Sequence, residues 1–329
     1  MKSSILIIYT GGTIGMKNDA ETGALVPFDF SAIYDEFPSL KRLNVDIDVL
    51  TMDPVIDSSN VTPANWAALA ELIRDNYARY DGFVVLHGTD TMSLSLIHIS
   101  EPMSYTASAM SFMLENLAKP VVFTGSQIPI GVLRTDGREN LITAIEIAGA
   151  HIGGRPEVPE VSLYFQNRLF RANRTTKRSA EALSAFRSYN YPPLAEVGVN
   201  IAYNLPAILH PTEVSPQLRI ATRLADGIEV VKLFPGLGEN ILRAMLSAPG
   251  LRAVVLETFG AGNAPTNEWF IRVLKEAIGR GIIILNITQC GGGKVSMELY
   301  ETGLRLQEIG VLCGHDMTTE AAVTKLMYV

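Results

Sequence analysis

Two stretches, ILIIYTGGT at residues 5–13 and GFVVLHGTDT at residues 82–91, decide the fold of this 329-residue chain. Each begins with a continuous apolar run and ends in a loop of glycine and threonine. Continuous apolar runs are typical of parallel strands in a sheet that is covered on both faces. Because open α/β sheets bind ligands beyond the carboxyl ends of their strands, we expect both loops to face one crevice.

The segments between these stretches alternate between helical and strand patterns. Thr62 followed by Pro63 is a typical helix start, and apolar residues at 66, 69, 73 and 77 recur at helical spacing. A further strand, helix and strand are expected at residues 120–123, about 137–149 and 161–164. This alternation predicts a wound, mostly parallel sheet in the N-terminal part of the chain.

Five prolines interrupt the pattern between residues 189 and 217, which favours an interdomain connection there. Alternation resumes after it, with strands expected at 227–234, 252–256 and 282–287 and helices at about 239–247 and 267–277. The sequence therefore predicts an α/β protein with a larger N-terminal domain at 1–188, a linker at 189–217 and a smaller C-terminal α/β domain at 218–329. Residues 321–329 form a helical pattern without a stop signal, which is typical of an incomplete C-terminus.

Composition and charge favour a protein that acts on a small molecule. The chain is 47% hydrophobic and carries a net charge of −7, and its pI is about 5.4. A negative protein repels phosphate backbones and anionic lipids, so nucleic-acid and membrane partners are disfavoured. The N-terminus enters a strand without a signal-peptide pattern, from which we expect a cytoplasmic protein. Cys290 and Cys313 lack metal-ligand spacing and are predicted to be buried, reduced thiols.

The threonines of the two loops need a base before they can act as nucleophiles. His87 and His315 lie beside glycines and could equally serve loop structure, and His98, His151 and His210 lie in no motif. Burial can lower the pKa of a lysine enough for it to act as a base. Lys177, which follows the strand at 161–164 and its short loop, is the best placed lysine.

The first loop, TGGTIG at residues 10–15, has two other interpretations. Its glycines could let main-chain N–H groups approach a phosphate, but it lacks the G-x-G-x-x-G spacing and the lysine of a Walker loop. It could also be a structural turn. The presence of the second loop, with its own threonines and a carboxylate, favours a reactive site over either alternative.

Taken together, the motifs of this chain resemble those of the bacterial type I, cytosolic L-asparaginases. The resemblance runs from about residue 5 to residue 328. Each of its motifs would be weak evidence for the family on its own. It is carried by TGGTIG at 10–15, DSS at 57–59, HGTDT at 87–91, TGSQ at 124–127, RTTK at 174–177, GAGNAP at 260–265 and NITQC at 286–290.

The resemblance implies a set of catalytic and substrate-binding residues. Thr13 would attack the side-chain amide of asparagine and form an acyl-enzyme, with loss of ammonia and without a metal or organic cofactor. Thr89, Asp90 and Lys177 would form a proton relay in which Asp90 also pairs with the α-ammonium group of the substrate. The remaining implied substrate contacts come from the α-carboxylate-binding serines, the glycine loops, one glutamine and one asparagine: Ser58, Ser59, Gly12, Gly88, Gln127 and Asn263.

Each assignment has a structural alternative. Asp90 could cap its loop, Ser58 could serve the turn before Thr62, and Lys177 could belong to a solvated cationic face with its arginine neighbours. Like-charged neighbours also favour the neutral form of a lysine, so those arginines do not argue against a base.

The chain departs from the family pattern at the loop tyrosine that assists the nucleophile. Leu25 stands at about the position of that tyrosine. Tyr300 matches a motif from which some relatives supply a tyrosine across a subunit contact, and it is the candidate substitute; packing at such a contact is its alternative. The resemblance implies homodimers that complete each site, with Asn263 and Tyr300 as donated residues, and tetramers built from two such dimers.

A second departure is the segment at residues 94–104, whose removal would join Ser93 to Tyr105 and restore the family pattern. The segment is either a genuine insert or an artefact of sequence assembly. A genuine insert would have to leave the crevice as a surface excursion before a helix that begins near Tyr105. Three functions remain open from the sequence: asparaginase, a glutaminase or amidotransferase-type amidase, and a weakened amino-acid-binding protein.

Overall fold

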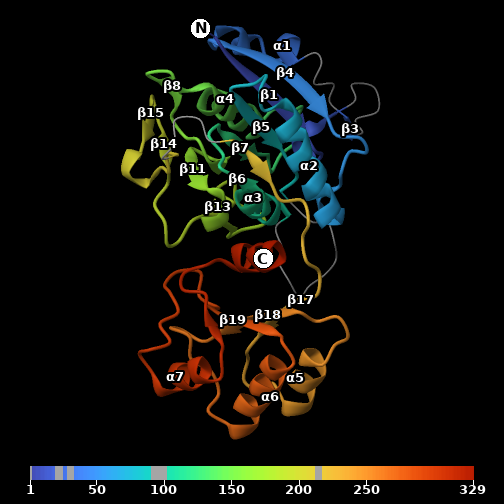
Figure 1. Ribbon diagram of the computed structural model, residues 1–329. Helices are drawn as coiled ribbons and strands as arrows, with labels where there is room; N and C mark the ends of the chain where they lie inside the picture. Colours follow the sequence, from blue (N-terminus) through green and yellow to red (C-terminus); the bar gives the residue numbers. More distant parts are fainter. Residues whose placement is uncertain (1, 19–24, 28–32, 90–101, 212–216) are drawn as a thin grey trace. The chain divides into compact units, whose positions relative to one another are not determined.

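The computed structural model describes residues 2–18, 25–27, 33–89, 102–211 and 217–329, and the chain divides into two compact units, Met1–Thr222 and Arg223–Val329 (Figure 1). Each unit has its own sheet and its own apolar core. The predicted linker, residues 189–217, includes two strands of the first unit's sheet, and the division falls at residue 222 instead. Prolines flank these short strands and mask their pattern in the sequence.

The first unit is built on an eight-stranded sheet in the order β15-β14-β11-β10-β7-β5-β1-β4. The five strands from β10 to β4 run parallel, and β11, β14 and β15 are antiparallel. This sheet confirms the predicted fold class. Its strands are β1 (Ser3–Tyr9), β4 (Val45–Thr51), β5 (Gly82–Leu86), β7 (Val121–Thr124), β10 (Val161–Phe165), β11 (Arg168–Arg171), β14 (Ala195–Val197) and β15 (Ile201–Tyr203).

Helices cover both faces of this sheet. Alternate residues of β5 point to opposite faces, so Val84 packs with α4 (Gly137–Gly149) in one core layer. Phe83 lies on the other face, where its ring meets Tyr77 at the end of α2 (Pro63–Asn76). The side chains of α2 and α3 (Pro102–Met113) are joined by a buried hydrogen bond. Burial of β1 and β5 on both faces explains their continuous apolar sequences.

The helix expected near Tyr105 begins three residues earlier, at Pro102. Proline is accepted in the first helical turn because its missing N–H has no partner there in any helix. Residues 102–104 of the unusual segment are therefore buried helix, and its residues 94–101 lie outside the described residues. The surface excursion that we expect for a genuine insert concerns residues 94–101.

Short elements complete the first unit. They are η1 (Thr13–Gly15), β2 (Met16–Asn18), β3 (Leu25–Pro27), α1 (Ile33–Glu36), η3 (Pro38–Arg42), η4 (Ser58–Asn60), β6 (Leu114–Glu115), β8 (His151–Ile152), β9 (Arg155–Pro156), η5 (Ala172–Arg174), β12 (Thr176–Lys177), β13 (Phe186–Arg187), η6 (Leu205–Ala207) and β16 (Arg219–Ile220).

The second unit contains a four-stranded parallel sheet in the order β17-β18-β19-β20. Its α5 and α6 pack on one face, where Leu242 and Phe270 meet Val254, and α8 packs on the other, where Leu326 meets Val255. The elements are β17 (Ile228–Lys232), α5 (Glu239–Leu246), β18 (Ala253–Thr258), α6 (Glu268–Gly279), β19 (Ile283–Thr288), α7 (Glu301–Glu308), β20 (Leu312–Cys313) and α8 (Thr319–Tyr328).

The predicted burial of the two cysteines is wrong. Cys290 is exposed and Cys313 is half-buried, and both are free thiols. Cys290 follows the last residues of β19 into a glycine-rich turn, where the apolar pattern of the strand no longer applies. Within the described residues, none of the helices is long and apolar enough to span a membrane.

Candidate active site

The two loops that follow β1 and β5 meet main chain to main chain. Gly12 has a φ of 96°, and a Cβ atom built on it would lie 2.3 Å from the Cα atom of Gly88. A Cβ atom built on Gly88 would lie 2.5 Å from the Oγ atom of Ser58. Only glycine allows these approaches without displacing the neighbouring loop. The structure thus brings together Gly12, Gly88 and Ser58, three of the predicted site residues.

Thr13 lies immediately after this contact, as the first residue of η1. The turn is held by a hydrogen bond from the Gly15 N–H to the Gly12 oxygen (3.1 Å) and by one from the Tyr9 hydroxyl to the same oxygen (3.2 Å). Burial raises the pKa of Tyr9, so its hydroxyl remains a donor. The Thr13 side chain is half-buried and makes no hydrogen bond to a residue that the structure describes. The hydrogen bonds to the Gly12 oxygen therefore fix where Thr13 lies in the chain.

Ser58 and Ser59 begin η4, a turn that is tied to the first loop. The Ile56 N–H donates to the Thr10 oxygen at 2.7 Å, and the Asp57 carboxylate accepts from the Ser59 N–H at 3.1 Å. Ser58 is 4% exposed, and Ser59 is half-buried. The aspartate thus acts as the cap of the turn and fixes the position from which both serines project.

A second group of predicted residues gathers around Thr89. Its hydroxyl, which is buried, donates to Oε1 of Gln127 at 3.1 Å. Nζ of Lys177, which is 7% exposed, donates to the main-chain oxygen of Thr89 at 2.8 Å. Nε2 of Gln127 donates to the oxygen of Ala182. These bonds join the loops after β5 and β7 to the segment that carries Lys177.

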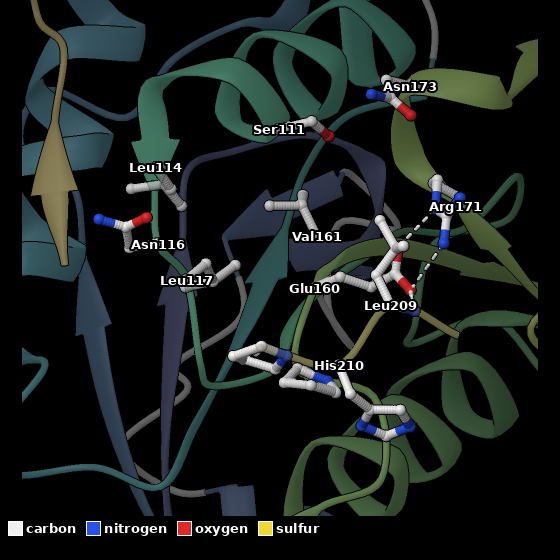
Figure 2. A pocket seen from close by; sticks show the side chains of 12 residues that line it. Ser111, Leu114, Asn116, Leu117, Glu160, Val161, Arg171, Asn173, Leu209 and His210 are labelled. Carbon is white, nitrogen blue, oxygen red and sulfur yellow. Dashed lines mark hydrogen bonds and ion pairs between the residues drawn. The ribbon is translucent and has the colours of Figure 1, made fainter. Parts of the chain in front are cut away.

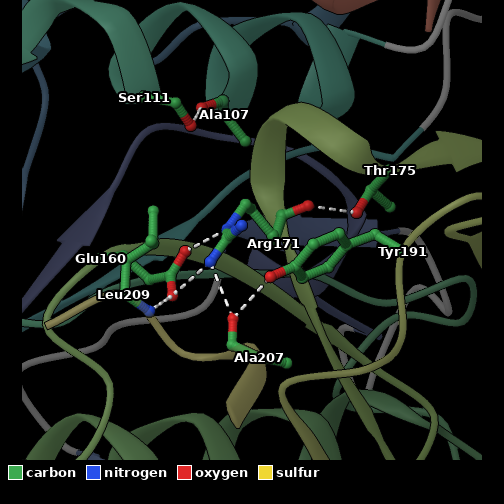
Figure 3. Close-up of polar contacts among 8 residues, drawn as sticks. All are labelled: Ala107, Ser111, Glu160, Arg171, Thr175, Tyr191, Ala207 and Leu209. Atoms are coloured by element: carbon green, nitrogen blue, oxygen red, sulfur yellow. Dashed lines mark hydrogen bonds and ion pairs between the residues drawn. The ribbon is translucent and has the colours of Figure 1, made fainter. Parts of the chain in front are cut away.

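Lys177 is presented by a hairpin in which β12 pairs with β13. The chain reaches this hairpin from β11 through η5, where the Thr175 hydroxyl donates to the Arg171 oxygen at 2.7 Å (Figure 3). Position 171 is itself fixed by a salt bridge with Glu160, in which the two side chains are 11% and 10% exposed. The position of Lys177 therefore depends on this anchor at the opposite edge of the sheet.

The Glu160–Arg171 pair is fully engaged on both sides. Nε of Arg171 donates to one carboxylate oxygen at 2.6 Å, and a second nitrogen donates to the other oxygen at 3.2 Å and to the Ala207 oxygen at 2.8 Å (Figure 3). The carboxylate also accepts from the Leu209 N–H at 2.9 Å. Burial disfavours the guanidinium charge, but the bonded carboxylate more than offsets this and raises the pKa of Arg171.

A cavity of about 430 Å³ adjoins this ion pair (Figure 2). It lies where β7 and β10 begin, so it opens at the amino edge of the parallel strands, opposite the glycine loops. Arg171 and Glu160 lie at its wall, and none of the predicted site residues lines it. The cavity is therefore separate from the candidate active site.

Two family models cover nearly the whole chain: Asparaginase, N-terminal matches residues 4–209, and the Glutaminase/Asparaginase C-terminal domain matches residues 227–329. The chain belongs to the asparaginase family. It is 43% identical to L-asparaginase 1 of Escherichia coli over 99% of this chain and 91% of that protein. The crystal structure of L-asparaginase I from Vibrio cholerae, 42% identical, matches with a TM-score of 0.87 over 100% of this chain and 92% of that one.

A further structural relative of this asparaginase-family chain is the thermostable L-asparaginase from Thermococcus kodakarensis. It is 30% identical and matches with a TM-score of 0.83 over 99% of this chain and 92% of that one. Within the described residues, no group of three His, Cys, Asp or Glu side chains is placed to hold a metal ion.

Sequence reasoning missed two residues that hold the site of this asparaginase-family chain together. Asp136, at the start of α4, accepts hydrogen bonds from the N–H groups of Gln127 and Ile128 at 3.0–3.1 Å. Asn140, one turn later, donates to the Gly125 oxygen at 2.9 Å. The sequence shows an aspartate before a helix and an asparagine four residues later. It does not show which loop these two side chains bind.

Of the other predicted site residues, one lies outside the described residues and two belong to the second unit. Asp90 lies outside the described residues. Asn263 and Tyr300 belong to the second unit, where Oδ1 of Asn263 accepts from the hydroxyl of Thr302, two residues beyond Tyr300. Tyr300 precedes α7 and is 52% exposed. The loop of Asn263 and the start of α7 are therefore neighbours within that unit.

Proposed function

We propose that this protein hydrolyses L-asparagine to L-aspartate and ammonia, with Thr13 as the nucleophile. The observation that carries the proposal is the contact of Gly12, Gly88 and Ser58, because it brings three of the family motifs together beside the residue that precedes Thr13. Full-length similarity to L-asparaginases at 42–43% identity supports the substrate.

Substrate binding follows from the zwitterionic character of asparagine. Ser58 and Ser59 donate to its α-carboxylate, and Asp90 accepts from its α-ammonium group. Fixing both charged groups places the side-chain amide carbon close to the Thr13 hydroxyl, which converts an encounter into an intramolecular attack. Main-chain N–H groups beside Gly12 and Gly88 stabilise the developing oxyanion.

The reaction then proceeds in two steps. The Thr13 oxygen gives up its proton and bonds to the amide carbon. The carbon–nitrogen bond then breaks, and the nitrogen takes up that proton and leaves as ammonia, so that an ester joins Thr13 to the substrate. Water attacks this ester, releases aspartate and returns a proton to Thr13. Lys177 serves the proton transfers through Thr89; its 2.8 Å hydrogen bond to the main-chain oxygen of Thr89 keeps its amine beside that residue, which supports this role. Gln127 holds the Thr89 hydroxyl in position.

The second unit contributes through oligomers in the same proposal. Asn263 and Tyr300 act in the site of a neighbouring subunit of a homodimer, and two such dimers form a tetramer. The tyrosine stands in for the one that Leu25 replaces. The two free thiols favour a cytoplasmic location, where disulfides rarely form.

The test is a measurement of both products with the purified full-length protein. Ammonia and aspartate should appear in equal amounts from asparagine. Glutamine, one methylene longer, is expected to react less efficiently by a factor of roughly 10–200. Ser58→Ala should raise the KM for asparagine more than it lowers kcat, and Ser247→Ala on the second unit is its control. Binding of asparagine without product would leave only an amino-acid-binding function, and faster release from glutamine would make the protein a glutaminase.

A further inference from the structure

His87 occupies a central position between the sheet and the helices of the first unit. It follows β5 directly and precedes Gly88 and Thr89, and its main-chain N–H donates to the Thr124 oxygen at 3.0 Å. The residue is 3% exposed, and its ring lies beside Phe123. A buried imidazole needs a partner for each nitrogen, and both partners are present.

The two ring nitrogens have partners that define the position of the proton. Nδ1 lies 2.9 Å from the Gly88 oxygen, which can only accept, so Nδ1 carries a hydrogen. Burial lowers the pKa of His87 to about 4, against the opposing effect of the Gly88 hydrogen bond, so the ring is neutral at neutral pH. A neutral imidazole with its hydrogen on Nδ1 has an acceptor at Nε2.

The acceptor nitrogen is reached by a chain of donors from two helices. The Thr106 hydroxyl of α3 lies 3.0 Å from Nε2 and donates to it. The same hydroxyl oxygen accepts from the indole N–H of Trp66 on α2 at 2.9 Å. Along this chain of hydrogen bonds, which runs from Trp66 through Thr106 and His87 to Gly88, every donor thus has one acceptor. The direction of each bond is therefore fixed. Reversing the imidazole tautomer would leave two donors facing Thr106 and two acceptors facing each other at Gly88.

This chain of hydrogen bonds ends on the peptide that joins Gly88 to Thr89. The C=O and N–H groups of a trans peptide point to opposite sides, so anchoring the Gly88 oxygen on His87 turns the Thr89 N–H away from the ring. The same residue carries the hydroxyl that contacts Gln127 and the oxygen that accepts from Lys177. The orientation of this peptide plane therefore fixes the Thr89 N–H and the Cα atom of Thr89, from which its hydroxyl and its carbonyl group project.

We propose that Trp66, Thr106 and His87 form a positioning relay that fixes the Gly88–Thr89 peptide for catalysis, with His87 held in the Nδ1–H tautomer. The expected effect of this relay on turnover rests on the proposed asparaginase function. None of its three side chains is assigned a contact with substrate.

The kinetic test removes the central hydroxyl without changing its shape. Thr106→Val should lower kcat for asparagine roughly tenfold while KM changes by less than about threefold, because the loop is misplaced by a fraction of an ångström. Thr106→Ser, which keeps the hydroxyl, should restore most of the rate. Ser108→Ala, which removes a buried hydroxyl without a partner among the described residues from the same helix, is the control and should leave kcat unchanged. Equal kcat for Thr106→Val and Thr106→Ser would overturn the relay.

A second measurement does not depend on activity or on a folded variant. The ¹⁵N chemical shifts of histidine-labelled wild-type protein should show His87 as a neutral ring with a protonated Nδ1 at pH 7. A neutral ring protonated at Nε2, or a cationic ring, would overturn the relay even in an active enzyme. If instead the protein releases no ammonia but His87 has the expected tautomer, the function fails and the structural relay stands.

Discussion

The two edges of the eight-stranded sheet differ in how they are held. At the carboxyl edge the main chains of two loops touch, and the side chains of Thr89, Gln127 and Lys177 are joined there by hydrogen bonds. At the amino edge a buried ion pair lies beside a cavity of about 430 Å³. The cavity and the buried ion pair are thus at the edge whose cavity is lined by none of the predicted site residues. The comparison teaches that the close main-chain approach and this cavity mark different edges of one sheet.

The two edges are nevertheless connected through a short piece of chain. Arg171 ends β11 at the amino edge, and six residues later Lys177 reaches Thr89. We interpret the amino edge as a mechanical support and the carboxyl edge as the reactive site. Substitutions at the two edges should therefore differ in whether they change turnover or stability.

The largest effect is expected at the lysine of the carboxyl edge. Lys177→Met should lower kcat for asparagine by about 10²–10⁴-fold, the contribution of a positioned general base. Lys275→Met, which makes the same change at an exposed lysine of α6 in the second unit, should stay within about threefold of wild type, because exposed substitutions away from a site have small effects. Steady-state ammonia release measures both. A Lys177→Met enzyme with near wild-type kcat would remove the lysine from the reaction.

The next effect concerns the contact between the loops. Gly12→Ala places a methyl group 2.3 Å from the Cα atom of Gly88, so the loops must separate. Misplacement by about 1 Å is expected to lower kcat/KM about 10²-fold. Gly198→Ala is the matched control, because a Cβ atom there meets nothing within 4 Å. If both variants retained full activity, close approach of the loops would not define the site.

The amino edge should show a loss of stability instead. Arg171→Met leaves Glu160 buried and unpaired, which typically costs about 3–5 kcal/mol of the free energy of unfolding. The exposed pair of Arg168 and Glu196 is the control, and Arg168→Met should cost less than about 1 kcal/mol. Urea unfolding of the first unit measures both. Replacing both partners, as Glu160→Leu with Arg171→Met, should recover part of the loss; no recovery would mean that the main-chain bonds to residues 207 and 209 dominate.

The smallest effect is a pH dependence that belongs to His87. Its pKa falls from 6.5 to about 4 on folding, so between these values the unfolded chain binds a proton that the folded protein does not. Stability should therefore fall as the pH is lowered from 6.5 to 4, with a slope of up to about 1.4 kcal/mol per pH unit. His87→Asn should lose this part of the slope. An unchanged slope in urea titrations at several pH values would contradict the buried neutral ring.

Much of this arrangement could be predicted from the sequence because its signals are local. The apolar runs of β1 and β5, the Thr62 and Pro63 helix start and the glycine loops each depend on a few consecutive residues, and the structure places these elements as expected. The family motifs added further predicted site residues to those that the local patterns indicate: Ser58, Thr89, Gln127 and Lys177.

The remaining features depend on contacts between distant residues. Nothing near Glu160 in the sequence identifies Arg171 as its partner, since a β-hairpin must first bring them together. In the sequence, nothing distinguishes Thr106 from the other residues of an apolar helix. Its contact with His87 exists only because α3 packs beside that residue in the folded protein. The strands β14 and β15 are three residues each in a proline-rich segment, so they depend on pairing with β11 rather than on their own pattern.

The most direct test of the central claim compares Thr13→Ala with Thr13→Ser at the carboxyl edge. We predict that Thr13→Ala releases ammonia at least about 10³-fold more slowly than wild type while still binding L-aspartate in calorimetry, because only the attacking oxygen is removed. Thr13→Ser, which keeps that oxygen, should retain measurable turnover. Ammonia release by Thr13→Ala within about tenfold of wild type would contradict the assignment of Thr13 as the nucleophile.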